Sequence, residues 1–148
     1  MSVEGICYLD TSALAKWYLH EVGSETVTRY IQELDIAVIS QLTMVEMRSL
    51  LARRRRMGEI DATLEARIFA TFQEDIALAH LQLYPVEVSL WSEAANLIAC
   101  HPDFPLKTLD ALHLAVVKLH GIEQLATADR VMANAAEATG IRADFFGS

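Results

Sequence analysis

The sequence predicts a single α/β domain in which a central parallel β-sheet is flanked by α-helices on both faces. Short apolar runs alternate with longer segments of helical periodicity along the whole chain. Within these runs apolar residues follow one another without polar alternation, which is typical of parallel strands covered by helices on both sides. With 148 residues, 53% of them apolar, the chain is long enough for one hydrophobic core and short for two.

Residues that start or stop helices divide the first half of the chain. Thr11-Ser12 can cap a helix directly after the first apolar run, and Gly23-Ser24 restarts the helical pattern. Ser40 offers a cap after the second apolar run, Gly58 ends that helix, and Asp61 opens the next one. The expected elements here are strand 6–9, helices 11–19 and 24–34, strand 36–39, and helices 41–57 and 61–80.

Prolines and glycines divide the second half. Pro85 places the third apolar run at a sheet edge or strand start, because proline has no N–H to donate to a neighbouring strand. Two prolines make 101–107 (HPDFPLK) a loop, and Gly121 and Gly140 end the helices before them. The expected elements are strand 83–88, helices 89–100 and 108–120, strand 124–128, helix 129–140 and strand 141–146.

Composition excludes several classes of protein. The net charge of −8 argues against a module that simply coats nucleic acid, although not against an enzyme that acts on it. No Cys or His spacing fits a zinc finger, and we expect Cys7 and Cys100 to be free thiols. The N-terminal segment does not resemble a secretory signal, and no apolar stretch approaches the ~18 residues that cross a bilayer. We therefore expect a cytoplasmic protein that does not enter a membrane.

Four carboxylates fall where a parallel sheet places its functional sites. Asp10 and Asp129 directly follow apolar strands, Glu46 lies in the second turn of a helix after a strand, and Asp110 lies in the first turn of another helix. The carboxyl ends of parallel strands share one edge, so these acids are candidates for one site. For Asp10 and Asp129, helix capping is the alternative. For Glu46, on an apolar helix face, the alternative is a buried ion pair.

Such a cluster of acids predicts a metal ion. Carboxylates brought together repel one another and raise each other's pKa values, and a cation removes that repulsion. Oxygen ligands without Cys or clustered His suit Mg²⁺ or Mn²⁺. These ions lower the pKa of water and neutralise a phosphate under attack, so the chemistry predicted is metal-dependent hydrolysis of phosphodiester bonds.

Four segments also match one known family in content and order. They are YLDTSALAKWYL, ISQLTMVEMRSLLARR, LKTLDALHLAVV and LATADRVMANAAEATGI, which together span nearly the whole chain. On these segments the chain resembles the PIN-domain nucleases and, within them, the VapC-type toxins of toxin–antitoxin pairs. The resemblance implies one PIN domain over residues 1–148, an RNA substrate, a cognate antitoxin that restrains the site, and a homodimer.

The resemblance also assigns residues. It places Asp10, Glu46, Asp110 and Asp129 in the family's acidic quartet, where they would hold one or two Mg²⁺ or Mn²⁺ ions and act in catalysis. Ser12 matches the hydroxyl that the family usually carries beside the first acid, and Thr127 matches a hydroxyl two residues before the last.

Basic residues near the acids are candidates for contacts with RNA phosphates. Arg48, Arg53 and Lys107 are the positions we select, although ordinary salt bridges would also suit them. The run 53–56 cannot face a single ligand, because four consecutive helix residues point around most of the circumference. His113, one turn after Asp110, is expected to be a hydrogen-bonded core residue rather than a ligand.

Three other functions share these features. A PIN-type nuclease that processes RNA or cuts DNA outside a toxin system would carry the same acids. A non-catalytic PIN-like module that binds RNA or protein would be expected to lack some of them, and none is missing. A phosphatase with Asp10 as nucleophile usually has a second Asp two residues later, where this chain has Ser12.

Overall fold

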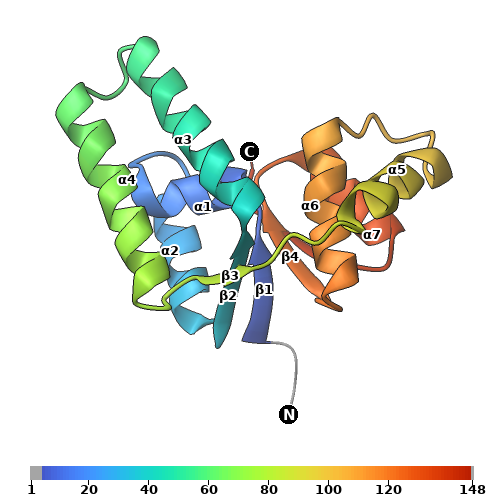
Figure 1. The fold of residues 1–148 in the computed structure, drawn as a ribbon. Coiled ribbons are helices and arrows are strands. Elements are labelled where there is room, and N and C mark those ends of the chain that lie inside the picture. Colours follow the sequence, from blue (N-terminus) through green and yellow to red (C-terminus); the bar gives the residue numbers. More distant parts are fainter. Residues whose placement is uncertain (1–4, 148) are drawn as a thin grey trace.

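The protein contains the parallel sheet that the sequence predicts. In the computed structural model, which describes residues 5–147, five strands pair in the order β3-β2-β1-β4-β5 and every pair is parallel (Figure 1). The strands are β1 (Ile6–Leu9), β2 (Ile36–Ser40), β3 (Gln82–Tyr84), β4 (Gln124–Thr127) and β5 (Arg142–Phe145). Because β1 lies between β2 and β4, the order of the strands reverses at the junction of β1 and β4.

Helices cover both faces of this sheet, as expected. Across residues 5–147 they are α1 (Thr11–Tyr18), α2 (Ser24–Glu33), α3 (Gln41–Arg56), α4 (Ala62–Ala77), α5 (Leu90–Cys100), α6 (Thr108–Leu119) and α7 (Arg130–Ala138). The helices α1 to α4 pack on one face and α5 to α7 on the other (Figure 1). Side chains of β1 alternate between the two cores, with Cys7 and Leu9 in the first and Tyr8 in the second.

The third strand is shorter than predicted. It ends at Tyr84 instead of extending to residue 88, because Pro85 cannot donate to a neighbouring strand. The N–H of Val86 leaves the sheet and donates to the Gln41 side chain at 3.1 Å. The predicted place of this strand at a sheet edge is confirmed.

The end of α4 and the cap of α1 also differ from the prediction, whereas the other helix boundaries lie within two residues of it. The helix α4 ends at Ala77 rather than near residue 80, and Ala79 beyond it has a left-handed backbone with φ of 62°. Helix α1 is capped by Asp10, whose side chain accepts from the Thr11 N–H, and not by Thr11-Ser12. The strand-end acid therefore also begins the next helix.

Two further expectations concern cysteines and membranes. Cys7 is buried, Cys100 is exposed, and both are free thiols, as predicted. Among the helices of residues 5–147, none is both long enough and apolar enough to span a bilayer.

Candidate metal centre

The ends of β1 and β4 form the foundation of the site. Asp10 follows β1, and its N–H donates to the carbonyl of Ala126 in β4 at 2.9 Å. Asp129 lies just beyond the end of β4. In open α/β sheets a crevice forms where the strand order reverses, and ligands commonly bind there.

Asp10 is the most buried of the four acids. Only 5% of its surface is exposed, and its carboxylate accepts three hydrogen bonds. The donors are the Thr11 N–H at 2.9 Å, the Ser12 hydroxyl at 2.9 Å and the Thr127 hydroxyl at 2.7 Å. These bonds fix the carboxylate at one orientation.

The hydroxyls of Ser12 and Thr127 join the two strand ends. Besides donating to Asp10, the Ser12 hydroxyl accepts from the N–H of Ala128 at 2.9 Å. The Thr127 hydroxyl accepts from the N–H of Asp129 at 3.0 Å. Both predicted hydroxyls therefore lie beside Asp10, where they hold the first and last acids in fixed relation.

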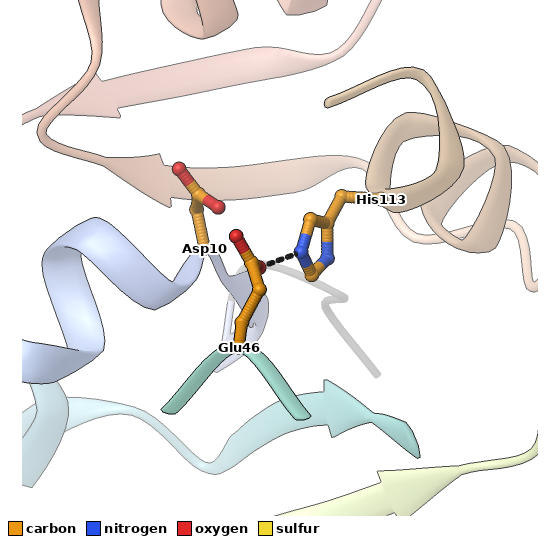
Figure 2. A group of neighbouring side chains, drawn as sticks. All are labelled: Asp10, Glu46 and His113. Atoms are coloured by element: carbon orange, nitrogen blue, oxygen red, sulfur yellow. Dashed lines mark hydrogen bonds and ion pairs between the residues drawn. The ribbon is translucent and has the colours of Figure 1, made fainter. Parts of the chain in front are cut away.

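Glu46 enters the site from α3 and meets His113 of α6. Figure 2 shows the side chains of Asp10, Glu46 and His113 converging, with a hydrogen bond between His113 Nε2 and Glu46 Oε1. The same Glu46 oxygen accepts from the Thr11 hydroxyl at 2.7 Å. The alternative of an ion pair for Glu46 thus has a partner when the ring of His113 is protonated.

His113 is buried and hydrogen-bonded, as the sequence predicts, but its partner was not foreseen. Its ring is 0% exposed, and Nδ1 lies 2.6 Å from the Tyr8 hydroxyl. Sequence reasoning missed the contact with Glu46, although the spacing of three residues after Asp110 places His113 on the same helix face. The hydroxyl of Thr11 on Glu46 was also missed.

Asp129 and Asp110 differ in what their carboxylates do. Asp129 caps α7 by accepting from the N–H groups of Val131 and Met132, so the capping alternative and the site prediction are both compatible with its position. The half-buried carboxylate of Asp110 accepts no hydrogen bond from residues 5–147. Of the four acids, Asp110 is therefore the one whose carboxylate is not held in place by a hydrogen bond within the described residues.

Burial and neighbouring charges shift the pKa values of Asp110, Asp10 and Glu46. Burial, then the charges of Asp10 and Asp129, raise the pKa of Asp110 to about 6. Burial also raises the pKa of Asp10, against the opposing effects of His113 and the two hydroxyls. Burial works to raise the pKa of Glu46 as well, but the hydrogen bond and charge of His113 outweigh it, and that pKa is lowered.

The four acids line one cleft of about 710 Å³. Its apolar wall comes mainly from α3, and the cleft continues along that helix to Arg53 and Arg56. Arg54 pairs instead with Glu21 at 2.9 Å and Glu59 at 3.2 Å, and Arg55 pairs with Glu65 at 3.0 Å. The basic run divides between cleft and salt bridges because its members point in different directions, as predicted.

The other two basic candidates lie outside the cleft. The guanidinium of Arg48 lies 4.7 Å from the centre of the Phe69 ring in α4, where it makes a cation–π contact. Lys107 is exposed at the residue before α6 and does not line the cleft. The structure thus brings Arg53 near the acids but not Arg48 or Lys107.

The donors in the cleft fit a hard divalent cation. Among residues 5–147, no Lys or Arg forms an ion pair with any of the four acids. His113, when protonated, offsets part of their negative charge through its contact with Glu46. Carboxylate oxygens are ligands that Mg²⁺ and Mn²⁺ accept. Asp10, Glu46 and His113 each offer an atom within 4.8 Å of the others, although both ring nitrogens of His113 already have protein partners.

Comparison with known families gives the site its context. The family model of the PIN domain matches residues 7–138. The chain belongs to the PIN-domain family. A curated relative of this PIN domain, Ribonuclease VapC46 of Mycobacterium tuberculosis, is 34% identical over 137 residues, which cover 90% of this chain and 92% of that protein.

Solved structures share the fold of this PIN domain. Mycobacterium tuberculosis VapC20, described as a sarcin–ricin loop cleaving toxin, superposes with a TM-score of 0.68 at 20% identity, covering 87% of this chain and 94% of that one. A chain of FitAB bound to a DNA fragment superposes with a TM-score of 0.71 at 17% identity, covering 94% of each chain. At these identities the likeness is one of fold.

Proposed function

We propose that this PIN domain is a Mg²⁺- or Mn²⁺-dependent endoribonuclease and the toxin of a type II toxin–antitoxin pair. The observation that carries the proposal is the convergence of four acids, remote in sequence, on one cleft at the reversal of the strand order. The names of VapC46 and VapC20 support RNA as the substrate class.

In this proposal the four acids bind the cation and neighbouring hydroxyls orient them. Asp10, Glu46, Asp110 and Asp129 would hold one or two cations, with Asp10 kept in place by Ser12 and Thr127. The bound ion supplies the activation of water and the neutralisation of charge on the phosphate under attack. No protein nucleophile is required.

The cleft suggests a path for the RNA. Arg53 and Arg56 lie at its α3 side, beyond the acids, and present positive charge to a flanking phosphate. The apolar side chains between the acids and these arginines offer a surface for bases. We propose no phosphate contact for Arg48 or Lys107, because neither lines the cleft.

The other partners follow from the family. One structural neighbour is a toxin–antitoxin complex from Klebsiella pneumoniae, which supports an antitoxin partner for this chain. We further propose that the protein forms a homodimer and acts in the cytoplasm, where its RNA substrates are.

The enzyme assay uses antitoxin-free protein and total RNA with Mg²⁺ or Mn²⁺. We expect cleavage that a chelator stops and that Asp110→Asn abolishes. Asp110→Asn is the most informative substitution, because the Asp110 carboxylate accepts no hydrogen bond from residues 5–147. Loss of this carboxylate should therefore leave the fold intact. Equal RNA patterns from wild type and variant would contradict the nuclease assignment.

The toxin assignment has its own test. Expression of the wild-type chain should arrest growth, and co-expression with the product of a short adjacent gene should restore it. Cleavage in vitro without growth arrest would instead indicate an RNA-processing role.

A further inference from the structure

A buried chain of hydrogen bonds leads from the core to Glu46. The Ser40 hydroxyl, which caps α3, lies 2.9 Å from the Tyr8 hydroxyl of β1. The Tyr8 hydroxyl lies 2.6 Å from His113 Nδ1, and His113 Nε2 bonds Glu46 (Figure 2). The side chains of Ser40, Tyr8 and His113 are all 0% exposed.

We propose that His113 is a positioning residue that fixes the Glu46 carboxylate for the divalent cation, and that Tyr8 fixes the ring of His113. This inference rests on the proposed function, since it concerns the same cation. It assigns His113 a place behind the carboxylate rather than on the metal, because both of its ring nitrogens are engaged by protein groups.

The directions of these hydrogen bonds are consistent with that role. When the ring is neutral, Nδ1 accepts from the Tyr8 hydroxyl and Nε2 carries the hydrogen that Glu46 accepts. When the ring is charged, Nε2 still carries a hydrogen. The contact with Glu46 therefore persists in either state of the ring.

The placement of the ring explains why Glu46 needs such a partner. Glu46 belongs to α3, in the layer of α1 to α4, and its side chain is 26% exposed at the cleft. His113 belongs to α6 in the opposite layer, and Tyr8 lies in β1 between them. Hydrogen bonds from His113 and Thr11 reach the same oxygen, Oε1, and no donor among residues 5–147 occupies Oε2, which is therefore available to the cation.

Two substitutions at His113 separate positioning from simple packing. The amide nitrogen of glutamine can reach the place of Nε2 and donate to Glu46, whereas the shorter asparagine reaches only the place of Nδ1. We expect His113→Asn to weaken Mn²⁺ binding about 10- to 100-fold, as is typical for partners behind metal ligands. We expect His113→Gln to restore most of that affinity.

Tyr8→Phe keeps the ring in the core but removes the hydroxyl that orients His113, so it should also weaken Mn²⁺ binding. His120→Asn is the matched control, because His120 lies directly after α6 and donates to the carbonyl of Pro85 outside the cleft. Its Mn²⁺ affinity should equal that of wild type.

The measurement is titration of free Mn²⁺ by electron paramagnetic resonance, alongside metal-free thermal unfolding of each variant. A purely structural His113 would lower the unfolding temperature of His113→Asn and leave its Mn²⁺ dissociation constant unchanged, which would overturn the proposal. If His113→Asn does not fold, the Mn²⁺ affinity of Tyr8→Phe tests the proposal instead. An affinity equal to that of the wild type would overturn the proposal.

Pulsed electron paramagnetic resonance distinguishes the remaining alternative. A directly bound ¹⁴N on the Mn²⁺ would make His113 a ligand and overturn the positioning role. Failure of the proposed function has a different signature, since the wild-type protein would then leave RNA intact in Mn²⁺, whatever the variants do to its Mn²⁺ affinity.

Discussion

Replacing Asp110 with asparagine should stabilise the metal-free protein at neutral pH, even though the same change should abolish cleavage. The carboxylate of Asp110 accepts no hydrogen bond from residues 5–147, so asparagine forfeits no structural contact there. What the substitution removes is a charge that loses hydration on folding and that also lies near those of Asp10, Asp129 and Glu46. Removing both the burial cost and the repulsion favours the folded state.

The size of the effect follows from the shift in proton affinity. The pKa of Asp110 rises from the ordinary 3.8 to about 6 on folding, and each unit corresponds to about 1.4 kcal/mol. Because the carboxylate is only half-buried, solvent screening reduces the total to about 1–2 kcal/mol. For a domain of this size that gain raises the unfolding temperature by about 3–6 °C.

The sign of the pH dependence is fixed by the direction of the shift. The folded wild-type protein binds more protons at Asp110 than the unfolded chain does between pH 3.8 and about 6. Its free energy of unfolding therefore falls as the pH rises through that window. The gain in free energy of unfolding of Asp110→Asn over the wild type is therefore complete above about pH 6 and absent below pH 3.8.

The assay is calorimetric unfolding of both proteins in chelator at pH 7.5, with a second pair of scans at low pH. Asp103→Asn, at an exposed acid in the loop before α6, is the control and should leave the unfolding temperature unchanged. Saturating Mn²⁺ should stabilise the wild type more than the variant. If Asp110→Asn unfolds at a lower temperature than wild type in chelator at pH 7.5, the carboxylate stabilises α6 and the predicted gain in stability is refuted.

Other positions test the remaining parts of the site. Thr127→Val removes the hydroxyl that joins Asp10 to Asp129, so Mn²⁺ titration should show about 10- to 100-fold weaker binding. Asp129→Ala should lower the free energy of unfolding by about 1 kcal/mol in chelator, because the cap of α7 is lost. Asp129→Asn should retain the cap and the stability. Identical chemical denaturation curves for the alanine variant and the wild type would contradict the capping role. Arg53→Ala should raise KM for RNA and reduce its salt dependence, whereas Arg48→Ala should leave KM unchanged because its guanidinium rests on Phe69.

The sequence predicts where the acids lie in the fold better than it predicts their hydrogen-bond partners. Asp10 and Asp129 follow apolar strands, and strand direction alone brings those ends to one edge. Glu46 and Asp110 could be added because each interrupts an apolar helix face. The bond between Tyr8 and His113 joins residues 105 positions apart, and no periodicity records which buried polar groups will meet.

Packing between elements accounts for what the sequence leaves open. The sequence places Arg48 two residues after Glu46, but α4 provides Phe69 on the side of α3 that Arg48 faces. The apolar pattern predicts a third strand that continues past Pro85, where the Gln41 side chain instead accepts from the backbone N–H of Val86. In each case the deciding neighbour is distant in sequence.

The order in which the chain supplies its acids has a consequence for synthesis. Asp10 and Glu46 are made early, but Thr127 and Asp129 are made much later, and β4 must pair with β1 before the edge exists. A nascent chain on the ribosome therefore lacks the complete edge until β4 and Asp129 have been made. A premature stop codon anywhere before position 129 gives a product without the last acid, so a toxin of this design cannot act on its host as an N-terminal fragment that stops short of α7.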